Sequence, residues 1–169
     1  MTVIVGCKDK NRIHIGADSA VTAGSTQSVL KQPKVFKKGK ILMACCGLYR
    51  DIQLARVVFT PPEDTTDDAE EYLVTQFIPE LKKVLEPKEE VCNEIPFGCI
   101  IGYKNRLFSI DEIFSVCEED LVVDGIGGSI ALGVMRSSKL KPKARVRLAL
   151  ETACEVDLFC KRPITIKSI

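Results

Sequence analysis

The order of the expected elements constrains the fold of this chain more than any single motif, because strands and helices come in alternating blocks. Short β-rich runs open the chain at residues 3–8, 12–17, 35–36 and 41–46. Helical spacing of apolar side chains follows at residues 48–59 and 66–85. Three more β-rich runs cover residues 97–103, 107–110 and 113–116. Helices are then expected at residues 125–138 and 142–157, and a closing strand at 163–169.

This block order predicts two antiparallel sheets packed face to face, with a pair of helices on the outside of each. Such a four-layer αββα sandwich buries the apolar face of every expected element. The 169 residues suit one domain, since two domains of half that size would each have a thin core. We therefore expect a single α+β domain over residues 1–169. Thr66 is the expected N-cap of the second helix.

Composition argues against several classes of function. The chain has one histidine, His14, and its eight cysteines form no C-x-x-C pair, so neither a zinc site nor a serine–histidine triad is expected. The net charge of +1 gives no argument for nucleic-acid binding. No apolar run approaches the roughly 20 residues of a membrane helix, and the first ten residues do not resemble a signal peptide. The sequence thus predicts a cytoplasmic protein that binds neither nucleic acid nor membrane.

Charge is nevertheless uneven along the chain. Residues 61–91 are strongly acidic, and residues 136–147 are basic. Both segments are interpreted as solvated helix faces, with a surface that binds a partner as the alternative.

The start of the chain offers a nucleophile that needs no histidine. Removal of Met1 would make Thr2 the amino terminus, and the small side chain of threonine makes this removal plausible. Thr2 would then carry a hydroxyl nucleophile and a free α-amine on one residue. The ordinary pKa of an α-amine is roughly 7.7–8.0, so near neutral pH the amine can accept the hydroxyl proton.

The first hairpin predicts a carboxylate beside this threonine. A turn centred on Lys10 pairs Thr2 with Asp18 on the same face of the sheet. Asp18 would end a buried strand and need a positive partner, for which Lys34 is the candidate. Lys34 would favour the threonine alkoxide and the neutral amine. The alternative is a structural salt bridge between Asp18 and Lys34, beside an ordinary threonine.

Nearly the whole chain resembles the peptidase subunits of the proteasome type. The similar segments are TVIVGCKDKNRIHIGADS, KQPKVFKKGKILMACCGLYRD, DGIGGSIALGVM and LALETACEVDLF. They are similar to the bacterial HslV family and, more distantly, to proteasome β-subunits. In that pattern an aspartate and a lysine follow the nucleophile by 16 and 32 residues, as Asp18 and Lys34 follow Thr2 here. The resemblance, weakest over residues 60–95, implies a threonine-type endopeptidase with the N-terminal-nucleophile (Ntn) hydrolase fold that acts in protein degradation.

Further residues and partners are implied by the resemblance alone. Gly47 matches a glycine that ends the strand before the first helix, where its amide would hold an oxyanion, and Asp51 matches an aspartate four residues later. The resemblance also implies a homo-oligomeric ring, an ATP-dependent unfoldase, and unfolded protein or peptide substrates. No cofactor is required for peptide hydrolysis. A structural sodium ion is implied at the main-chain oxygens of Cys154, Asp157 and Cys160.

One position departs from the family pattern. Active relatives carry a serine in a G-S-G near the third helix, hydrogen-bonded to the amine of the nucleophile, whereas this chain has Ile126 between Gly125 and Gly127. Ser129 is the candidate substitute, and Glu151 matches an acidic residue of the last helix. Two alternatives to a peptidase therefore stay open: a non-catalytic scaffold subunit of a proteasome-like particle, or a small-molecule amidase of the same fold.

Overall fold

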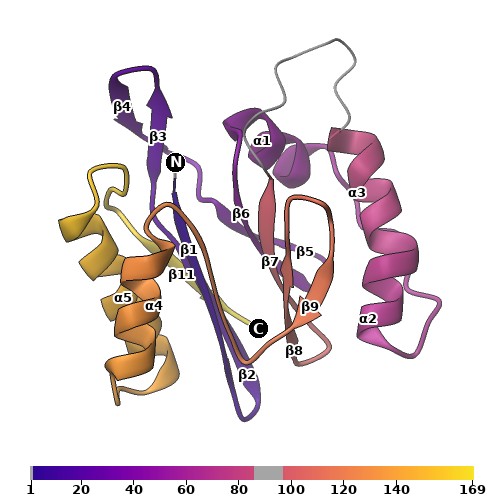
Figure 1. The fold of residues 1–169 in the computed structure, drawn as a ribbon. Coiled ribbons are helices and arrows are strands. Elements are labelled where there is room, and N and C mark those ends of the chain that lie inside the picture. Colours follow the sequence, from indigo (N-terminus) through magenta and orange to yellow (C-terminus); the bar gives the residue numbers. More distant parts are fainter. Residues whose placement is uncertain (1, 86–96) are drawn as a thin grey trace.

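The computed structural model describes residues 2–85 and 97–169, and its strands form two antiparallel sheets and a separate hairpin (Figure 1). The four-stranded sheet has the order β10-β1-β2-β11, with β1 (Val3–Asp9), β2 (Arg12–Ala17), β10 (Leu121–Gly125) and β11 (Thr165–Ser168). The five-stranded sheet has the order β5-β6-β7-β8-β9, with β5 (Val35–Lys38), β6 (Ile41–Cys46), β7 (Gly98–Tyr103), β8 (Arg106–Ile110) and β9 (Val116–Glu118). The hairpin consists of β3 (Ala20–Ala23) and β4 (Thr26–Val29).

Helices cover the outer face of each sheet, which gives the expected αββα order of layers (Figure 1). The four-stranded sheet is covered by α4 (Gly128–Ser137) and α5 (Pro142–Val156). The five-stranded sheet is covered by α1 (Tyr49–Val57), α2 (Ala69–Tyr72), the π-helical turn η1 (Leu73–Phe77) and α3 (Ile78–Leu85). In the described part of the chain, the helices are too short or too polar to cross a lipid bilayer.

The space between the two sheets is filled by apolar side chains. Those that are fully buried there include Ile4, Ile13, Ile15, Leu42, Ile100 and Leu107. Two further cores lie between each sheet and its helices. Burial on both faces explains why strands β1, β2, β6 and β7 are almost continuously apolar.

Successive side chains of β1 point to opposite faces of its sheet, and this alternation places the start of the chain. Val3 and Val5 pack with residues of α4 and α5, whereas Ile4 lies between the sheets. Gly6 is on the same face as Ile4, where the sheets come so close that an added Cβ would lie 2.8 Å from a methyl group of Ile100. Thr2 continues this inner face, so it lies at one end of the space between the sheets.

The structure corrects two details of the sequence prediction. The strand expected at residues 113–116 is wrong, because the Asp111 carboxylate accepts the backbone N–H groups of Ile113 and Ser115 at 3.0 and 2.8 Å and holds a turn there. The strand β9 begins only as that turn ends, and the sequence patterns did not predict β3, β4 or β10. Thr66 is not the N-cap of the second helix: the carboxylate of Asp68 accepts the first free N–H groups of α2.

Candidate active site

The hairpin of β1 and β2 brings the first residues close to Asp18. A two-residue turn joins the strands, so Ile4 pairs with Ala17 and the Asp18 N–H donates to the Val3 carbonyl at 3.2 Å. The prediction that Thr2 lies directly opposite Asp18 is therefore wrong by one residue. Both residues lie just beyond the paired strands, however, and their side chains meet.

Thr2, Asp18 and Lys34 form one buried, hydrogen-bonded group. The Thr2 hydroxyl donates to Asp18 Oδ1 at 2.8 Å, and Lys34 Nζ lies 2.8 Å from the same oxygen. Lys34 Nζ also donates to Thr2 Oγ1. The three residues are 2, 1 and 2% exposed, so water is nearly excluded from their contacts. A threonine hydroxyl held between a cation and a carboxylate is the geometry that an activated nucleophile needs.

Backbone groups complete the shell around the Asp18 carboxylate. Its Oδ1 accepts the Val3 N–H at 3.1 Å, and its Oδ2 accepts the N–H groups of Ala20 and Lys161 at 2.8 and 3.1 Å. Charge-assisted bonds to both oxygens fix the carboxylate and offset the cost of its burial. The contact from Lys161 comes from the segment after α5, and no sequence signal indicates it.

Lys34 is held by its neighbours on the loop before β5. Its carbonyl accepts the N–H of Cys45 at 3.3 Å, and the Pro33 carbonyl accepts a hydrogen bond from Arg56 at 3.2 Å. These bonds attach the loop to β6 and α1. The ammonium group is thereby fixed relative to the start of β1.

Gly47 forms the junction between β6 and α1. Its φ angle of 116° lies in the region that favours glycine, which accounts for a glycine at this position. Gly47 borders both cavities that meet at Thr2. Asp51 lies in the first turn of α1, and burial raises the pKa of its carboxyl group, an effect that Arg50 opposes.

Ile126 and Thr2 both border the larger of two cavities, so the departure from the family pattern lies near the candidate nucleophile. Ile126 follows Gly125, the last β10 residue that pairs with β1, and the next residue, Gly127, donates its N–H to the Thr2 carbonyl at 3.4 Å. Its side chain is 46% exposed, and it offers no hydrogen-bonding group. Ser129 is exposed on the first turn of α4, and over residues 2–85 and 97–169 no hydrogen bond joins its side chain to the group around Thr2. The structure therefore does not bring Ser129 to the site.

The segment expected to hold sodium is a turn at the end of α5. The Asp157 carbonyl accepts the Cys160 N–H at 3.3 Å, and burial, with a smaller effect of the Asp18 charge, raises the pKa of the Cys154 and Cys160 thiols to about 11 and about 12. Among the described residues, no three acidic, histidine or cysteine side chains gather in a metal-binding cluster. The sodium ligands implied by the resemblance are main-chain oxygens, a ligand type that hard cations prefer. Such a site needs no cluster of acidic, histidine or cysteine side chains, and the sodium site stays a prediction. Glu151 lies 3.7 Å from Arg147 on α5.

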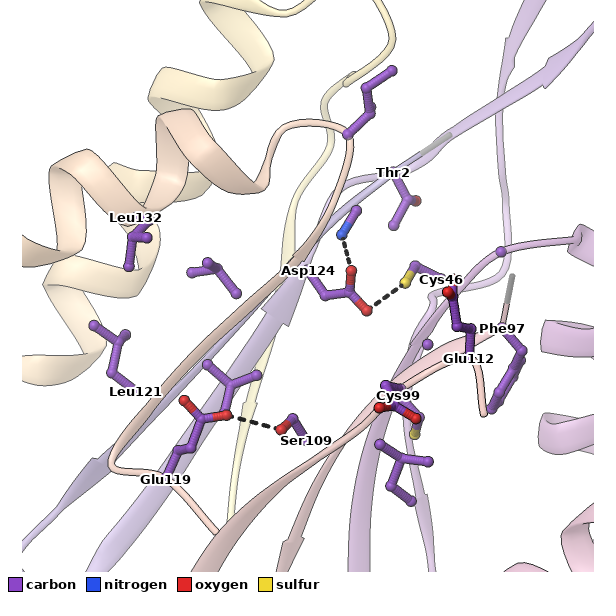
Figure 2. A pocket seen from close by; sticks show the side chains of 18 of the residues that line it. Thr2, Cys46, Phe97, Cys99, Ser109, Glu112, Glu119, Leu121, Asp124 and Leu132 are labelled. Carbon is purple, nitrogen blue, oxygen red and sulfur yellow. Dashed lines mark hydrogen bonds between the residues drawn. The ribbon is translucent and has the colours of Figure 1, made fainter. Parts of the chain in front are cut away.

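Two cavities of very different size meet at Thr2. The larger has a volume of about 1010 Å³ and extends from Thr2 past Asp124 towards Glu119 (Figure 2). The smaller, of about 70 Å³, is bordered by Thr2, Lys34 and Gly47, together with Ala20, Val21, Thr22, Leu30, Leu48, Tyr49 and Ile52. A chain bound across Thr2 could therefore place groups in a space on either side of the hydroxyl.

No family model matches the sequence. The four layers, with a buried threonine at the start of β1, define the fold of the proteasome-like Ntn hydrolases, as the resemblance implied. Solved structures with this fold align over nearly the full length of this chain. BPH from Thiobacillus denitrificans in complex with epoxomicin shares 19% sequence identity, with a TM-score of 0.82, 99% of this chain covered and 98% of that chain.

Two further structures lead to the same conclusion. A second structure of Thiobacillus denitrificans BPH has 20% identity and a TM-score of 0.76, with coverage of 100% of this chain and 97% of that chain. Eukaryotic HslV from Trypanosoma brucei has 16% identity and a TM-score of 0.71, with coverage of 99% and 98%. At such low identity, these likenesses establish the fold and leave the activity to be argued from the site.

Proposed function

We propose that this protein is a threonine-type endopeptidase subunit in which Thr2, freed by removal of Met1, is the nucleophile. The observation that carries the proposal is the Thr2 hydroxyl, which contacts both Asp18 and Lys34 in a buried group beside a large cavity. Met1 lies outside the described residues, so its removal is part of the proposal. The proposed reaction needs no cofactor.

Each step of the hydrolysis has a group to carry it. The Thr2 Oγ1 attacks the peptide carbonyl, and its proton passes to the α-amine of Thr2. Lys34 stabilises the developing alkoxide, while Asp18 orients Lys34. The oxyanion is stabilised by the Gly47 N–H and the positive end of α1. The amine then protonates the leaving nitrogen, and a water molecule hydrolyses the resulting ester by the same route, which restores the free hydroxyl.

Assembly and location follow from the same proposal. We propose a homo-oligomeric ring in the cytoplasm that encloses its active sites and receives unfolded proteins or peptides from an ATP-dependent unfoldase. An apolar surface at the end of α5 supports assembly: Val156 and Leu158 are 64 and 87% exposed, and Phe159 is also partly exposed. Such a surface is costly to leave in water and is typical of subunit contacts.

A non-catalytic scaffold subunit is the second candidate. Ile126 favours it, because an isoleucine at this position near Thr2 cannot hydrogen-bond the terminal amine. The peptidase requires removal of Met1, because only then does Thr2 carry a free α-amine. A scaffold subunit does not require it. The intact mass of protein from its native source is informative in one direction: retention of Met1 would favour the scaffold, because it blocks the α-amine that the proposed mechanism needs.

The decisive experiment compares three proteins of confirmed mass that lack Met1. The wild type should hydrolyse unstructured peptides and gain the mass of epoxomicin, which is bound in the Thiobacillus denitrificans structure. Thr2→Ala should lose hydrolysis while keeping its fold and its assembly. Thr75→Ala, a change of an exposed threonine on η1, should retain wild-type activity. Equal hydrolysis by wild type and Thr2→Ala would sink the proposal.

A further inference from the structure

The wall of the larger cavity next to Thr2 is formed by the end of β10. Ile4 pairs with Asp124 across β1 and β10, so Asp124 is on the inner face of the sheet, like Thr2. Thr2 immediately precedes β1, whereas Asp124 lies on the adjacent strand β10 and pairs with Ile4, two residues further along the chain. Figure 2 shows the Asp124 carboxylate between Thr2 and the deeper part of the cavity.

The hydrogen bonds of Asp124 come from uncharged donors. Its Oδ1 accepts the N–H of Gly125 at 2.5 Å, and its Oδ2 accepts the thiol of Cys46 at 3.1 Å. Burial, reinforced by the charge of Asp124, raises the pKa of Cys46 well above its usual range, so the thiol stays protonated as a donor. Throughout the described ranges, no lysine or arginine forms an ion pair with Asp124. Among the described residues, this half-buried carboxylate therefore has no ion-pair partner.

The opposite sheet is shaped to admit the carboxylate. Gly98, at the start of β7, faces Asp124, and any side chain at Gly98 would overlap the Asp124 oxygens. The strand pair β6–β7 places Gly98 beside Cys46. Gly98 and Cys46 thus leave room for the Asp124 carboxylate, although the neighbouring residues on the inner face of the sheet are apolar.

The rest of the cavity has the character of a cation-binding site. Among the described lining residues, four are acidic and one, Arg136, is basic; the acidic residues are Asp111, Glu112, Glu119 and Asp124. Two of these acids have local partners, since Asp111 holds a turn and Glu119 accepts the Ser109 hydroxyl at 2.8 Å. Apolar side chains between the acids provide contacts for an alkyl stem; they include Phe97, Ile110, Val122 and Leu132.

We propose that the larger cavity is a subsite for a lysine or arginine side chain of a peptide substrate, and that Asp124 is the residue that selects the cation. The inference rests on the proposed peptidase function, because it assigns a substrate preference to that same site. The alkyl stem of the substrate side chain lies along the apolar wall, and its charged end pairs with Asp124. Binding of the substrate thereby supplies an ion-pair partner that the described part of the chain does not provide.

The test uses pairs of peptides that differ only by lysine or norleucine at one position, scanned across the scissile bond. At one position the wild type should prefer lysine by roughly tenfold in kcat/KM, the size expected of one charge-assisted hydrogen bond. Asp124→Asn should abolish this preference and retain hydrolysis of the norleucine peptide, because its amide oxygen can still accept the Gly125 N–H. Asp67→Asn, an exposed acid far from the cavity, should leave the preference intact.

Two measurements separate this inference from the proposed function. Thr2→Ala should bind the lysine peptide more tightly than the norleucine peptide, and this difference should disappear in Thr2→Ala/Asp124→Asn. A wild type that hydrolyses no peptide defeats the peptidase proposal, while the binding difference still decides whether Asp124 selects a cation. The lysine preference of the wild type should also weaken as sodium chloride is added, which needs no variant. Equal binding of both peptides to Thr2→Ala, or a preference that persists in Asp124→Asn, overturns the inference.

Discussion

The Asp18 carboxylate lies 2.8 Å from the ammonium group of Lys34, and both residues are almost completely buried. The energy of such a pair depends on both members, because a buried charge that loses its partner has no water to replace it. The pair therefore supports the fold as well as the proposed chemistry. Changes to Lys34 can separate these two roles.

Lys34→Met should lower the free energy of unfolding by about 3–5 kcal/mol, since it leaves Asp18 as an unpaired buried charge. Lys34→Arg keeps the charge, so it should destabilise less than Lys34→Met. It should nevertheless lose most peptidase activity, because the planar guanidinium cannot reproduce the contacts of the ammonium group with Thr2. Chemical denaturation and peptide hydrolysis measure the two effects. Lys31→Arg, at an exposed position, is the matched control, and full activity of Lys34→Arg would contradict the assigned role.

Ile126→Ser should raise the rate of hydrolysis by a factor of roughly 2 to 13, the equivalent of one hydrogen bond of about 0.5–1.5 kcal/mol. The new hydroxyl is expected to hydrogen-bond the terminal amine of Thr2. Because the Ile126 side chain is nearly half exposed, the gain should come from this bond rather than from a change in hydration. The measurement is kcat on one peptide with protein that lacks Met1. Leu148→Ser, on the exposed side of α5, is the control, and an unchanged kcat in Ile126→Ser would show that the isoleucine is not limiting.

Asp64→Asn should lower the melting temperature at neutral pH and make it less sensitive to acid. Hydrogen bonds from Lys104 and then Tyr103 hold the pKa of the Asp64 carboxyl group far below its usual range. A depressed pKa adds stability above the unfolded value of roughly 3.9, and this stability is lost as the pH falls towards the folded value. The gap in melting temperature between wild type and variant should thus narrow between pH 5 and about pH 2. Asp67→Asn is the control, and a gap independent of pH would refute the linkage.

Cys154 and Cys160 should resist alkylation by iodoacetamide at pH 7.5 in the folded protein. Burial raises the pKa of these thiols to about 11 and about 12. Only a small fraction of each thiol is therefore ionised at pH 7.5, and the thiolate is the form that reacts. Cys117 is exposed on β9 and should react before Cys154 and Cys160. Peptide mapping by mass spectrometry follows each site over time. Unfolding in urea should equalise the rates, and modification of Cys160 as fast as Cys117 in the folded protein would contradict the predicted protection.

The sequence predicted best what depends on local pattern and spacing. The apolar runs predicted both central hairpins and the four layers, and the spacing of Asp18 and Lys34 from Thr2 predicted the group that the structure brings together. The error in register arose because Asn11 and Lys10 share a two-residue turn, a difference that composition does not reveal. A shift of one residue in the turn makes Val3, rather than Thr2, the residue opposite Asp18.

Contacts made by the backbone, or between distant segments, could not be predicted in this way. The Lys161 N–H that binds Asp18 is a main-chain group, which any residue except proline would supply. Strand β10 pairs with β1 over a long sequence separation, and its aspartate and glycine reduce its β-propensity. The sequence patterns therefore did not indicate Asp124, which the strand pairing places opposite Ile4 on the inner face of the sheet.

The order of the four-stranded sheet has a consequence for synthesis of the protein. β1 and β2 lie between β10 and β11, so the strands made first are flanked by strands made more than a hundred residues later. At about 5–20 residues per second, a ribosome needs roughly 5–20 seconds to pass from the end of β2 to β10. During that interval Thr2 and Asp18 lack the neighbours supplied by Gly125, Gly127 and Lys161. A nascent chain thus emerges without an organised nucleophile, and the proposed peptidase becomes competent only when its final strands are added.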